Sequence, residues 1–283
     1  MTMEKVLIST KNELSESDTK LFDQIRERFK IVKPHEADAV FVIGGDGAML
    51  DADARYRDLG LPFFGFNTGN VGHYMNPATV AVLDEIRAGS VRFVDIKHLM
   101  AFLQSPNGET ARQIYALNDV DFERASPQMA HVRVTINSIT APGHERIMAD
   151  AVIVATPAGS TGYNASVGGP ILSIEDDRIL VVPAGLVAHQ DWIPTVYSGE
   201  SVVVLEALSP NKRPVRVVAD GREIAQSGVT RLVVMRSQQM IRLGFAASHD
   251  YHAKIADLRA RRRTRLLAQL ADGDANSVCS SVP

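Results

Sequence analysis

Apolar runs and helical patterns alternate over roughly the first ninety residues of the chain. Three short apolar runs are typical of buried strands, at Lys5–Ser9, Ala39–Ile43 and Pro62–Phe66. Apolar positions at helical spacing lie between and after them, with Ser15 or Ser17 and Thr79 as candidate helix caps and a further helix ending near Leu59. This alternation predicts right-handed βαβ units around a mainly parallel sheet.

The pattern changes after about Val94, where short β-rich runs are separated by turn residues. Val132, Val134 and Ile136 alternate with polar residues before a turn at Asn137 and Ser138. Four more runs of this kind follow, at Ser201–Ala207, Pro214–Asp220, Arg231–Met235 and Met240–Phe245. We therefore expect a second, mostly antiparallel domain built as a sandwich or as stacked sheets.

The two patterns divide the chain into three parts. An α/β domain is expected over residues 1–95 and a β-rich domain over residues 96–245. Residues 246–283 are expected to hold a helix that resumes from Tyr251, followed by a flexible tail of small and polar residues.

Composition excludes several classes of function. The 283 residues carry 30 Lys and Arg against 33 Asp and Glu, a net charge of −3, which argues against a dedicated nucleic-acid binder. The single cysteine, Cys279, rules out an intramolecular disulfide framework and a cysteine-based zinc site. No apolar run approaches the ~20 residues of a membrane span, and the N-terminus lacks the pattern of a secretory leader. We expect a soluble, cytoplasmic protein without a membrane partner.

The first candidate site is a glycine loop that directly follows the second apolar run. Gly44, Gly45 and Gly47 surround Asp46, and glycines at this place let backbone N–H groups approach phosphate oxygens. The loop matches neither the Walker sequence nor the dinucleotide fingerprint. A carboxylate in a phosphate cradle is electrostatically unfavourable, which points to a general base or a metal ligand. A plain Asp-Gly turn between strand and helix is the alternative.

A second glycine-rich loop, Gly65–Gly72, follows the next strand and carries three glycines and two asparagines. Such a loop adopts positive φ angles readily and presents backbone amides. Two adjacent loops of this kind form a crevice at the carboxyl edge of a parallel sheet, where open α/β folds bind ligands.

The third segment runs from Thr156 to Asn164 beside a predicted buried strand. The hydroxyls of Ser160 and Thr161 and the ring of Tyr163 suit a nucleotide, since they offer hydrogen bonds and a stacking surface. The sequence around Ser160 also approaches the nucleophile elbow of serine hydrolases. Pro170 comes too soon for the long helix that an elbow requires, and no His-Gly-Gly element accompanies it.

The ordered set of these segments resembles the NAD kinase family. The glycine loop at Gly44–Gly47 is followed by Gly65, Asn67, Gly69 and Gly72, by Asn118-Asp119, by Asp150 leading into Thr-Pro-Ala-Gly-Ser-Thr, by Gly168-Gly169-Pro170-Ile171 and by Asp220-Gly221. Each motif alone is weak, whereas their order over about residues 4 to 265 is specific.

The resemblance implies ATP-dependent phosphorylation of the 2′-hydroxyl of the adenosine ribose of NAD, with Mg²⁺ or another divalent cation. Asp46 would activate that hydroxyl, and Gly44, Gly45 and Gly47 would shape the phosphate loop. It implies no particular metal ligands. The positions that would bind NAD or line the nucleotide sites are Asn67, Gly69, Gly72, Asn118, Asp119, Asp150, Ser160, Thr161, Gly162, Tyr163 and Asp220.

The resemblance also implies an architecture. An N-terminal Rossmann-like parallel α/β domain would be joined to a C-terminal β-sandwich-like domain that binds NAD and forms the subunit contact of a homodimer or homotetramer. The C-terminal helix would return to pack on the first domain.

The chain departs from the family pattern near the site. Ala48 replaces a threonine, Asp119 replaces a glutamate, and His73-Tyr74 replace Phe-Leu. These departures keep open a non-catalytic NAD(H)/NADP sensor on the same fold. A related kinase that shares the Gly-Gly-Asp-Gly loop and phosphorylates a lipid or a sugar is a second alternative, because Asn67-Thr68-Gly69-Asn70 resembles the Gly-Thr-Gly-Asn loop of lipid kinases. The use of polyphosphate in place of ATP, and of NADH in place of NAD, also stays open.

Overall fold

The computed structural model describes residues 3–264, except residues 12, 70, 71, 108, 189, 191, 193, 194, 226, 227, 252, 254 and 262. The backbone divides into two units, Met1–Ala247 and Ser248–Pro283. In the second unit the described residues from 251 to 264 are helical, as predicted. The return of this helix to the first domain stays a prediction, and the tail lies outside the described residues. None of the described helices combines the length and the apolar character that crossing a membrane requires.

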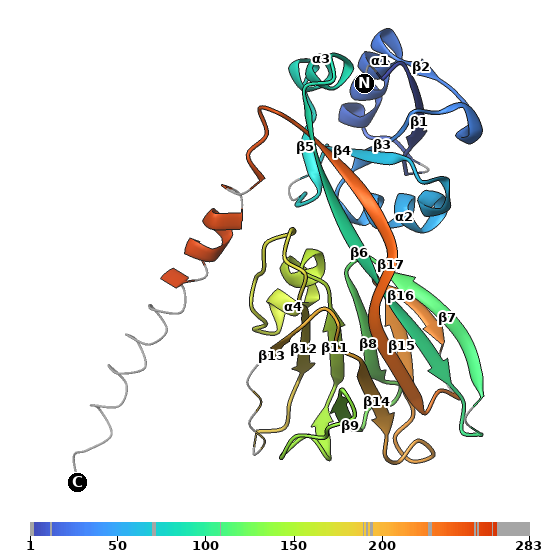
Figure 1. The fold of residues 1–283 in the computed structure, drawn as a ribbon, viewed down its shortest axis with the longest axis vertical. Coiled ribbons are helices and arrows are strands. Elements are labelled where there is room, and N and C mark those ends of the chain that lie inside the picture. The colour runs from blue at the N-terminus through green and yellow to red at the C-terminus, as the bar shows by residue number, and fades with distance from the viewer. Residues whose placement is uncertain are drawn as a thin grey trace, which may run out of the picture. The chain divides into compact units, whose positions relative to one another are not determined.

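The N-terminal part of the first unit is an α/β domain with a parallel sheet, as predicted (Figure 1). Strands β2, β1, β3 and β4 lie in this order, and each pairs in parallel with its neighbour. The elements are β1 (Lys5–Ser9), α1 (Glu16–Arg28), β2 (Lys30–Ile31), η1 (Pro34–Glu36), β3 (Ala39–Gly44), α2 (Asp46–Tyr56), η2 (Arg57–Leu59), β4 (Pro62–Asn67), β5 (Met75–Pro77) and α3 (Val80–Arg87).

Local sequence signals explain where these helices begin. Ser15 Oγ accepts a hydrogen bond from the Asp18 backbone N–H at 3.2 Å, and Asp18 Oδ2 accepts one from the Ser15 N–H at 2.9 Å, which completes a capping box. Thr79 caps α3 in the predicted way. Beneath the helices, the ring of Phe41 packs edge-on against the rings of Phe64 and Phe66.

The C-terminal part is a sandwich of antiparallel strands, which confirms the predicted fold class. Its elements are β6 (Val91–Gln104), β7 (Thr110–Ala116), β8 (Asp119–Arg124), β9 (Ala130–Ile136), β10 (Ile147–Ala149), β11 (Ala151–Ala155), η3 (Ala158–Thr161), α4 (Tyr163–Ser166), β12 (Ile179–Ala184), β13 (Thr195–Tyr197), β14 (Val203–Ala207), β15 (Val215–Ala219), β16 (Arg222–Ala225) and β17 (Arg231–Ala246). The six-stranded sheet has the order β13-β12-β11-β8-β15-β16.

The two faces of this six-stranded sheet meet different partners. Val120 and Phe122 of β8 point into the sandwich core. On the opposite face, Ile153 of β11 packs against Leu172, which follows η3 and α4 in the chain. Residues of β8 that alternate with the core positions therefore lie on a covered face rather than on an open surface.

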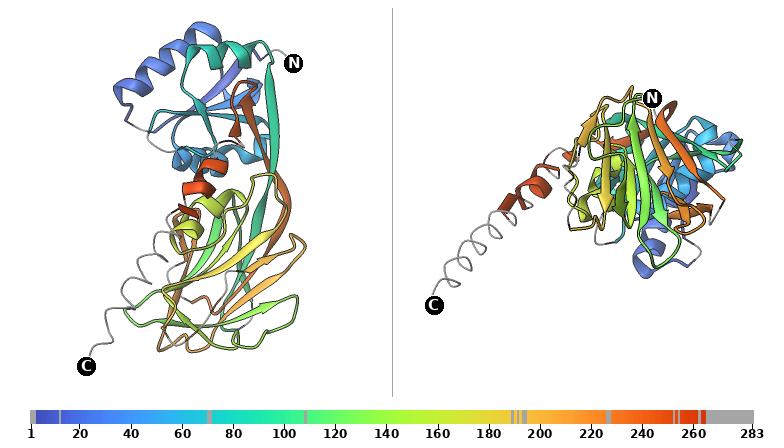
Figure 2. Two further views of the ribbon diagram at one scale, coloured as in Figure 1. Left: turned by 90° about the vertical axis from the view of Figure 1, so that its left-hand side faces the viewer. Right: turned by 90° about the horizontal axis from the view of Figure 1, so that it is seen from below.

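Two long strands join the α/β part to the sandwich. β6 and β17 run antiparallel to each other through both parts, and the end of β17 pairs in parallel with β4 (Figures 1 and 2). The two runs expected at Arg231–Met235 and Met240–Phe245 are thus one strand, with an irregularity between Arg236 and Met240. The domain boundary between residues 95 and 96 falls inside β6 and stays a prediction.

Candidate active site

The loop around Asp46 lies at the carboxyl end of β3, where α2 begins. Gly44 has a φ of +146°, and a Cβ at this position would lie 2.7 Å from the Cβ of Ala48, so this position requires glycine. Gly45 is the N-cap residue of α2, and Asp46 is its first residue. A Cβ on Gly47 would meet nothing within 4 Å, which leaves open space beside the first turn of α2.

The Asp46 carboxylate ties the first glycine loop to the end of the second. Its Oδ2 accepts a hydrogen bond from the His73 backbone N–H at 2.8 Å, and its Oδ1 accepts one from the Tyr74 N–H at 2.9 Å. A carboxylate oxygen has two acceptor positions, so each oxygen can accept a further proton or hydrogen bond. The arrangement fixes the direction of the carboxylate and leaves its acceptor capacity in place.

Helix α2 is held in place by a buried side-chain contact between its own Asp53 and His98 of β6. Asp53 and His98 are fully buried, and His98 Nε2 lies 2.9 Å from Asp53 Oδ1. The other ring nitrogen, Nδ1, lies 3.2 Å from the Gln239 carbonyl oxygen, so both ring nitrogens face acceptors. Since β6 carries His98 and β17 carries Gln239, this pair anchors the helix that begins at Asp46 to both long strands.

Residues of the second loop stabilise the loop itself. Asn67 Oδ1 accepts a hydrogen bond from the Gly69 N–H at 3.2 Å. A Cβ on Gly72 would lie 2.9 Å from the side chain of Asn67, which explains the need for glycine there. The predicted nucleotide contacts of Asn67, Gly69 and Gly72 stay predictions, and Asn70 lies outside the described residues.

Tyr74 connects this loop to the β-rich part. The side chain is 2% exposed, and its hydroxyl donates a hydrogen bond to Asn118 Oδ1. A chain of contacts therefore runs from the Asp46 carboxylate through Tyr74 to Asn118. The sequence indicated Tyr74 only as a departure from the family pattern, because nothing in a single sequence pairs it with Asn118.

Asp220 holds the backbone beside Asn118 from the other side. Asp220 and Gly221 form a two-residue turn between β15 and β16, with φ of 50° and 72°. The Asp220 carboxylate accepts hydrogen bonds from the N–H groups of Leu117 at 2.8 Å and Asn118 at 2.7 Å. Burial raises the pKa of Asp220, while these backbone hydrogen bonds lower it in part.

The third segment packs tightly on the same strand. A Cβ on Gly159 would lie 2.2 Å from the Asn118 carbonyl oxygen, so glycine is required for this close approach. Ser160 is fully buried, and its Oγ accepts a hydrogen bond from the Leu172 N–H at 3.0 Å. A buried hydroxyl committed to the backbone cannot act as a nucleophile, which argues against the serine hydrolase alternative. Thr161 Oγ1 donates to the Ala158 carbonyl oxygen at 3.4 Å, and Gly162 lies next to Asn118 and Asp119.

A cavity of about 520 Å³ opens beside β8. This volume suits a small-molecule ligand. The lining residues described are Leu50, Asn118, Asp119, Asp121, Glu123, Tyr163, Arg216, Val218, Asp220, Gly221 and Glu223. Leu50 lies one helical turn after Asp46, so the same helix contributes to both places.

The cavity thus brings together four residues that the sequence predicted: Asn118, Asp119, Tyr163 and Asp220. Asp150 is not among the lining residues described, and its carboxylate pairs with Arg124 Nε at 2.8 Å. The assignment of Asp150 to a nucleotide site stays a prediction.

The wall of the cavity is acidic. Burial and the neighbouring carboxylates raise the pKa of both Asp119 and Asp121. Arg216 pairs with Glu123, with an Nη2–Oε2 distance of 2.8 Å. Burial also raises the pKa of the Tyr163 hydroxyl, whose side chain is 39% exposed.

Sequence reasoning missed Asp121, Glu123 and Arg216. The alternation of acidic and apolar residues from Asp119 to Glu123 was a usable signal, because it places three carboxylates on one face of a strand.

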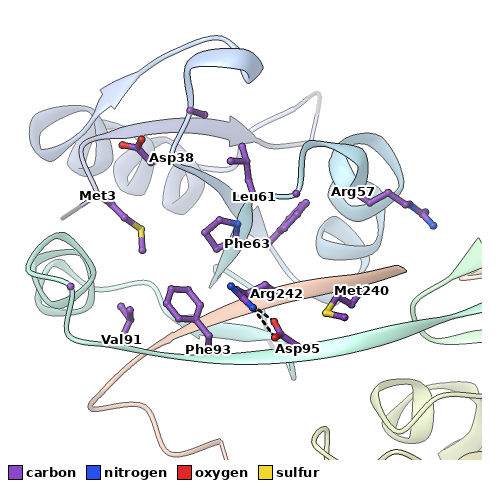
Figure 3. A pocket seen from close by; sticks show the side chains of 14 residues that line it. Met3, Asp38, Arg57, Leu61, Phe63, Val91, Phe93, Asp95, Met240 and Arg242 are labelled. Carbon is purple, nitrogen blue, oxygen red and sulfur yellow. Dashed lines mark hydrogen bonds and ion pairs between the residues drawn. The ribbon is translucent and has the colours of Figure 1, made fainter. Parts of the chain in front are cut away.

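A larger pocket, about 680 Å³, lies at the amino ends of the parallel strands (Figure 3). Met3, Asp38 and Leu61 line it just before β1, β3 and β4, and Phe93 lines it from β6. By volume alone, this pocket would be chosen as the functional site over the cavity beside β8. We assign the site to the smaller cavity, because open α/β folds bind ligands at the carboxyl ends of their strands, where Asp46 and both glycine loops lie.

Comparison with known proteins shows the family of the chain. Residues 1–89 match the ATP-NAD kinase N-terminal domain, and residues 117–243 match the ATP-NAD kinase C-terminal domain. The NAD kinase of Rickettsia felis is 32% identical over 240 residues, covering 83% of this chain and 90% of the relative. The NAD kinase of Rickettsia typhi is 32% identical over 237 residues, covering 83% and 90%.

Two solved structures share the fold. The yeast NADH kinase complexed with NADH has a TM-score of 0.77 at 18% identity, covering 91% of this chain and 87% of that one. An NAD kinase from Archaeoglobus fulgidus in complex with ATP has a TM-score of 0.68 at 21% identity, covering 92% and 98%. The matched domains, the relatives and the shared fold lead to one conclusion: the chain belongs to the NAD kinase family.

Proposed function

We propose that the glycine loops and the cavity beside β8 form the site at which this member of the NAD kinase family phosphorylates NAD with ATP, at the 2′-hydroxyl of the adenosine ribose. One observation carries this assignment. The Asp46 carboxylate, on the phosphate loop, is linked through Tyr74 to Asn118, on the wall of the cavity. A group that can take a proton is thereby held in a fixed relation to a pocket that suits a nucleoside.

In this proposal the loop binds the phosphates, and the cavity binds a ribose and a planar ring. The first turn of α2 offers free backbone N–H groups and the positive end of the helix dipole, which favour phosphate oxygens. Asn118 and Asp119 offer an amide and a carboxyl group for ribose hydroxyls. The partly exposed ring of Tyr163 offers a stacking surface for a planar ring of the dinucleotide.

Asp46 acts as the general base in this proposal. The substrate oxygen attacks the γ-phosphorus of ATP as the bond from that phosphorus to the bridging oxygen of ADP breaks. The proton of the attacking hydroxyl passes to the Asp46 carboxylate, which supplies about 10²–10⁴-fold of the rate. The two backbone hydrogen bonds to Asp46 orient the carboxylate before the substrate binds.

A divalent cation is proposed to enter with ATP. Within the described part of the chain, no group of three or more His, Cys, Asp or Glu side chains is arranged to hold a metal ion. Mg²⁺ is commonly held by substrate phosphates and water with one or two carboxylates, so a preformed protein site is not required. When bound, the ion would neutralise charge on the phosphates; we assign it no ligand on this chain.

We further propose that the protein works in the cytoplasm as a homodimer or homotetramer that uses the β-rich domain for its subunit contact. Ile139, on a turn of that domain, is 69% exposed and supports an apolar contact there. Trp192 and Ile193 are two further apolar residues that we propose near this contact. Trp192 stacks on His144 with ring centroids 4.0 Å apart, and Ile193 lies outside the described residues. Light scattering that gives a monomer at micromolar concentration contradicts this assembly.

Turnover with purified protein tests the proposed function. We expect NADP to form from NAD and ATP, and no product from diacylglycerol or fructose 6-phosphate. Nothing in the fold or the relatives favours the sensor or the lipid and sugar kinases. Binding of NAD without NADP formation, at any divalent cation concentration, identifies a sensor instead.

A further inference from the structure

Three carboxylates stand in a row on the covered face of β8. Asp119, Asp121 and Glu123 alternate with Val120 and Phe122, which point into the sandwich core. Successive residues on one face of a strand lie about 6.5–7 Å apart, so the three charges form a line rather than a cluster around one point. This spacing agrees with the finding that the described residues form no metal-ligand group.

Asp121, in the middle of this row, has no partner for one of its oxygens. The residue is 3% exposed, and its buried Oδ1 has no hydrogen-bond partner among the described residues. Its neighbours across the sheet are Ile153 on β11 and Val218 on β15, both apolar. A buried polar group without a partner is destabilising, so the position of Asp121 needs an explanation.

The basic side chain on this wall is engaged elsewhere. Arg216 pairs with Glu123 at 2.8 Å and donates to Glu223 Oε2 at 3.3 Å. Of the residues described as lining the cavity, five carry a carboxyl group and Arg216 is the single base. Asp121 therefore lines a cavity in which carboxyl groups outnumber basic groups.

The two redox forms of the proposed substrate differ in just this property. Oxidised NAD carries a positive charge on its planar nicotinamide ring, and NADH does not. An aromatic face and a carboxylate together attract a planar cation, and the cavity offers Tyr163 and Asp121 for that purpose.

We propose that Asp121 makes the cavity select oxidised NAD over NADH, by placing its carboxylate beside the cationic nicotinamide ring. This inference rests on the proposed function, because it assumes that the dinucleotide occupies the cavity. It goes beyond that function in naming the residue that sets the redox preference.

The charge on Asp121 responds to the ligand. Before binding, burial and the facing carboxyl groups of Asp119, Glu123 and Asp220 raise the pKa of Asp121 and favour its protonated form. The other titratable or charged groups that line the cavity are Arg216, Tyr163 and Glu223. A cation in the cavity favours the carboxylate and releases the proton. Binding of NAD should therefore release protons. The affinity for NAD should also increase relative to the affinity for NADH as pH rises.

Calorimetric binding of NAD and of NADH tests this inference. We expect the wild-type protein to bind NAD at least about fivefold more tightly, and Asp121→Asn to lose most of that ratio. Asp23→Asn, the same change of charge on the exposed surface of α1, is the matched control and should keep the ratio. Titrations of the wild-type protein in buffers of different ionisation enthalpy measure proton release and need no variant, so a poorly folded Asp121→Asn does not prevent a decision.

The outcomes separate this inference from the function beneath it. Equal affinities in the wild-type protein, an unchanged ratio in Asp121→Asn, or equal proton release with NAD and NADH overturn the role of Asp121 while NADP formation stands. If the wild-type protein binds neither dinucleotide and forms no NADP, the proposed function fails and the inference fails with it.

Discussion

Two hollows of the molecule, the pocket at the amino ends of the parallel strands and the cavity beside β8, differ in how their polar groups are satisfied. At the amino edge (Figure 3), Arg242 donates to both oxygens of Asp95, and Asp38 Oδ2 accepts from the N–H groups of Glu4 and Lys5. Beside β8, Asp121 is buried with an unpartnered oxygen. The amino-edge pocket is the larger, so volume alone is a poor guide to function here. Unsatisfied buried polar groups distinguish the two places better.

The two edges of the sheet also carry two aspartates with similar hydrogen bonds. Asp46 and Asp38 each accept two backbone N–H groups near the end of a parallel strand. Asp46 lies at the carboxyl end of β3 among glycines, and Asp38 lies just before the same strand begins. Hydrogen bonding therefore does not distinguish Asp46, the proposed catalytic residue, from Asp38, whereas the edge of the sheet at which each lies does.

The largest expected effect follows from this pair. Asp46→Asn keeps the shape of the side chain but cannot take the proton, so we expect kcat to fall by roughly 10²-fold or more. NAD affinity, measured by calorimetry, should change little. Asp38→Asn removes an equivalent carboxylate at the other edge and should leave kcat unchanged.

Two results contradict the assignment of Asp46. Near-normal turnover of Asp46→Asn shows that it is not the general base. Loss of NAD binding together with turnover, without loss of stability in thermal melts, makes it a binding residue instead.

The next largest effect is on the pH dependence of stability, which should differ between the carboxyl groups of the cavity beside β8 and those of the amino-edge pocket. Raised pKa values mean that folded Asp119, Asp121 and Asp220 hold protons that the unfolded chain releases near pH 4. Their contribution to stability is present below that pH and is lost as pH rises through the folded values. We expect the Tm of the unliganded protein to fall between about pH 5 and pH 8 more steeply than that of Asp121→Asn.

The amino edge should show the opposite sign. The hydrogen bonds from Arg242 lower the pKa of Asp95, so the contribution of Asp95 to stability is present above the usual carboxyl range and is lost as pH falls.

Asp121→Asn should be more stable than the wild-type protein at pH 8, by about 1 kcal/mol or more, since one pKa unit is worth 1.36 kcal/mol. Equal melting profiles from pH 5 to pH 8 contradict a protonated Asp121 in the unliganded cavity.

The sequence predicted most of the regular structure, because local signals decide it. Ser15 and Thr79 cap helices where the apolar spacing begins, and the glycine loops end buried strands. The division of β17 into two runs was wrong, since the polar stretch Arg236–Gln239 looks like a turn. Ser237 Oγ instead accepts the Gln239 N–H at 2.9 Å within a bulge, and the strand continues.

The candidate site was predictable in its loops and only in part in its wall. Asp46, Asn118 and Tyr163 belong to ordered motifs, whereas Asp121 reads as the solvent face of an alternating strand. That face is covered by the segment after β11, through contacts such as Ile153 with Leu172. Which face of a strand is covered depends on tertiary packing, so the pattern of one strand cannot reveal it.

A third prediction concerns the aromatic side of the cavity. NAD and NADP should each raise the Tm by mass action. Tyr163→Ala should weaken the NAD-dependent shift by about 1 kcal/mol, the value of one stacking contact. Phe93→Ala, which removes a 42% exposed ring at the amino edge, is the matched control and should leave the ligand-induced shift unchanged. An unaltered shift in Tyr163→Ala moves the nucleotide site elsewhere.

The smallest effect is expected from the ion pair of the amino-edge pocket. The side chains of Arg242 and Asp95 are 56% and 40% exposed, and exposed pairs of this kind contribute about 0.2–1 kcal/mol. Arg242→Gln should therefore shift the free energy of unfolding by no more than about 1 kcal/mol, less in high salt, because salt screens exposed charges. Urea unfolding at two salt concentrations measures the shift, and kcat for NAD should stay at the wild-type value. A fall in kcat or in NAD affinity would show that the amino edge takes part in the reaction, and the contrast between the two hollows would no longer hold.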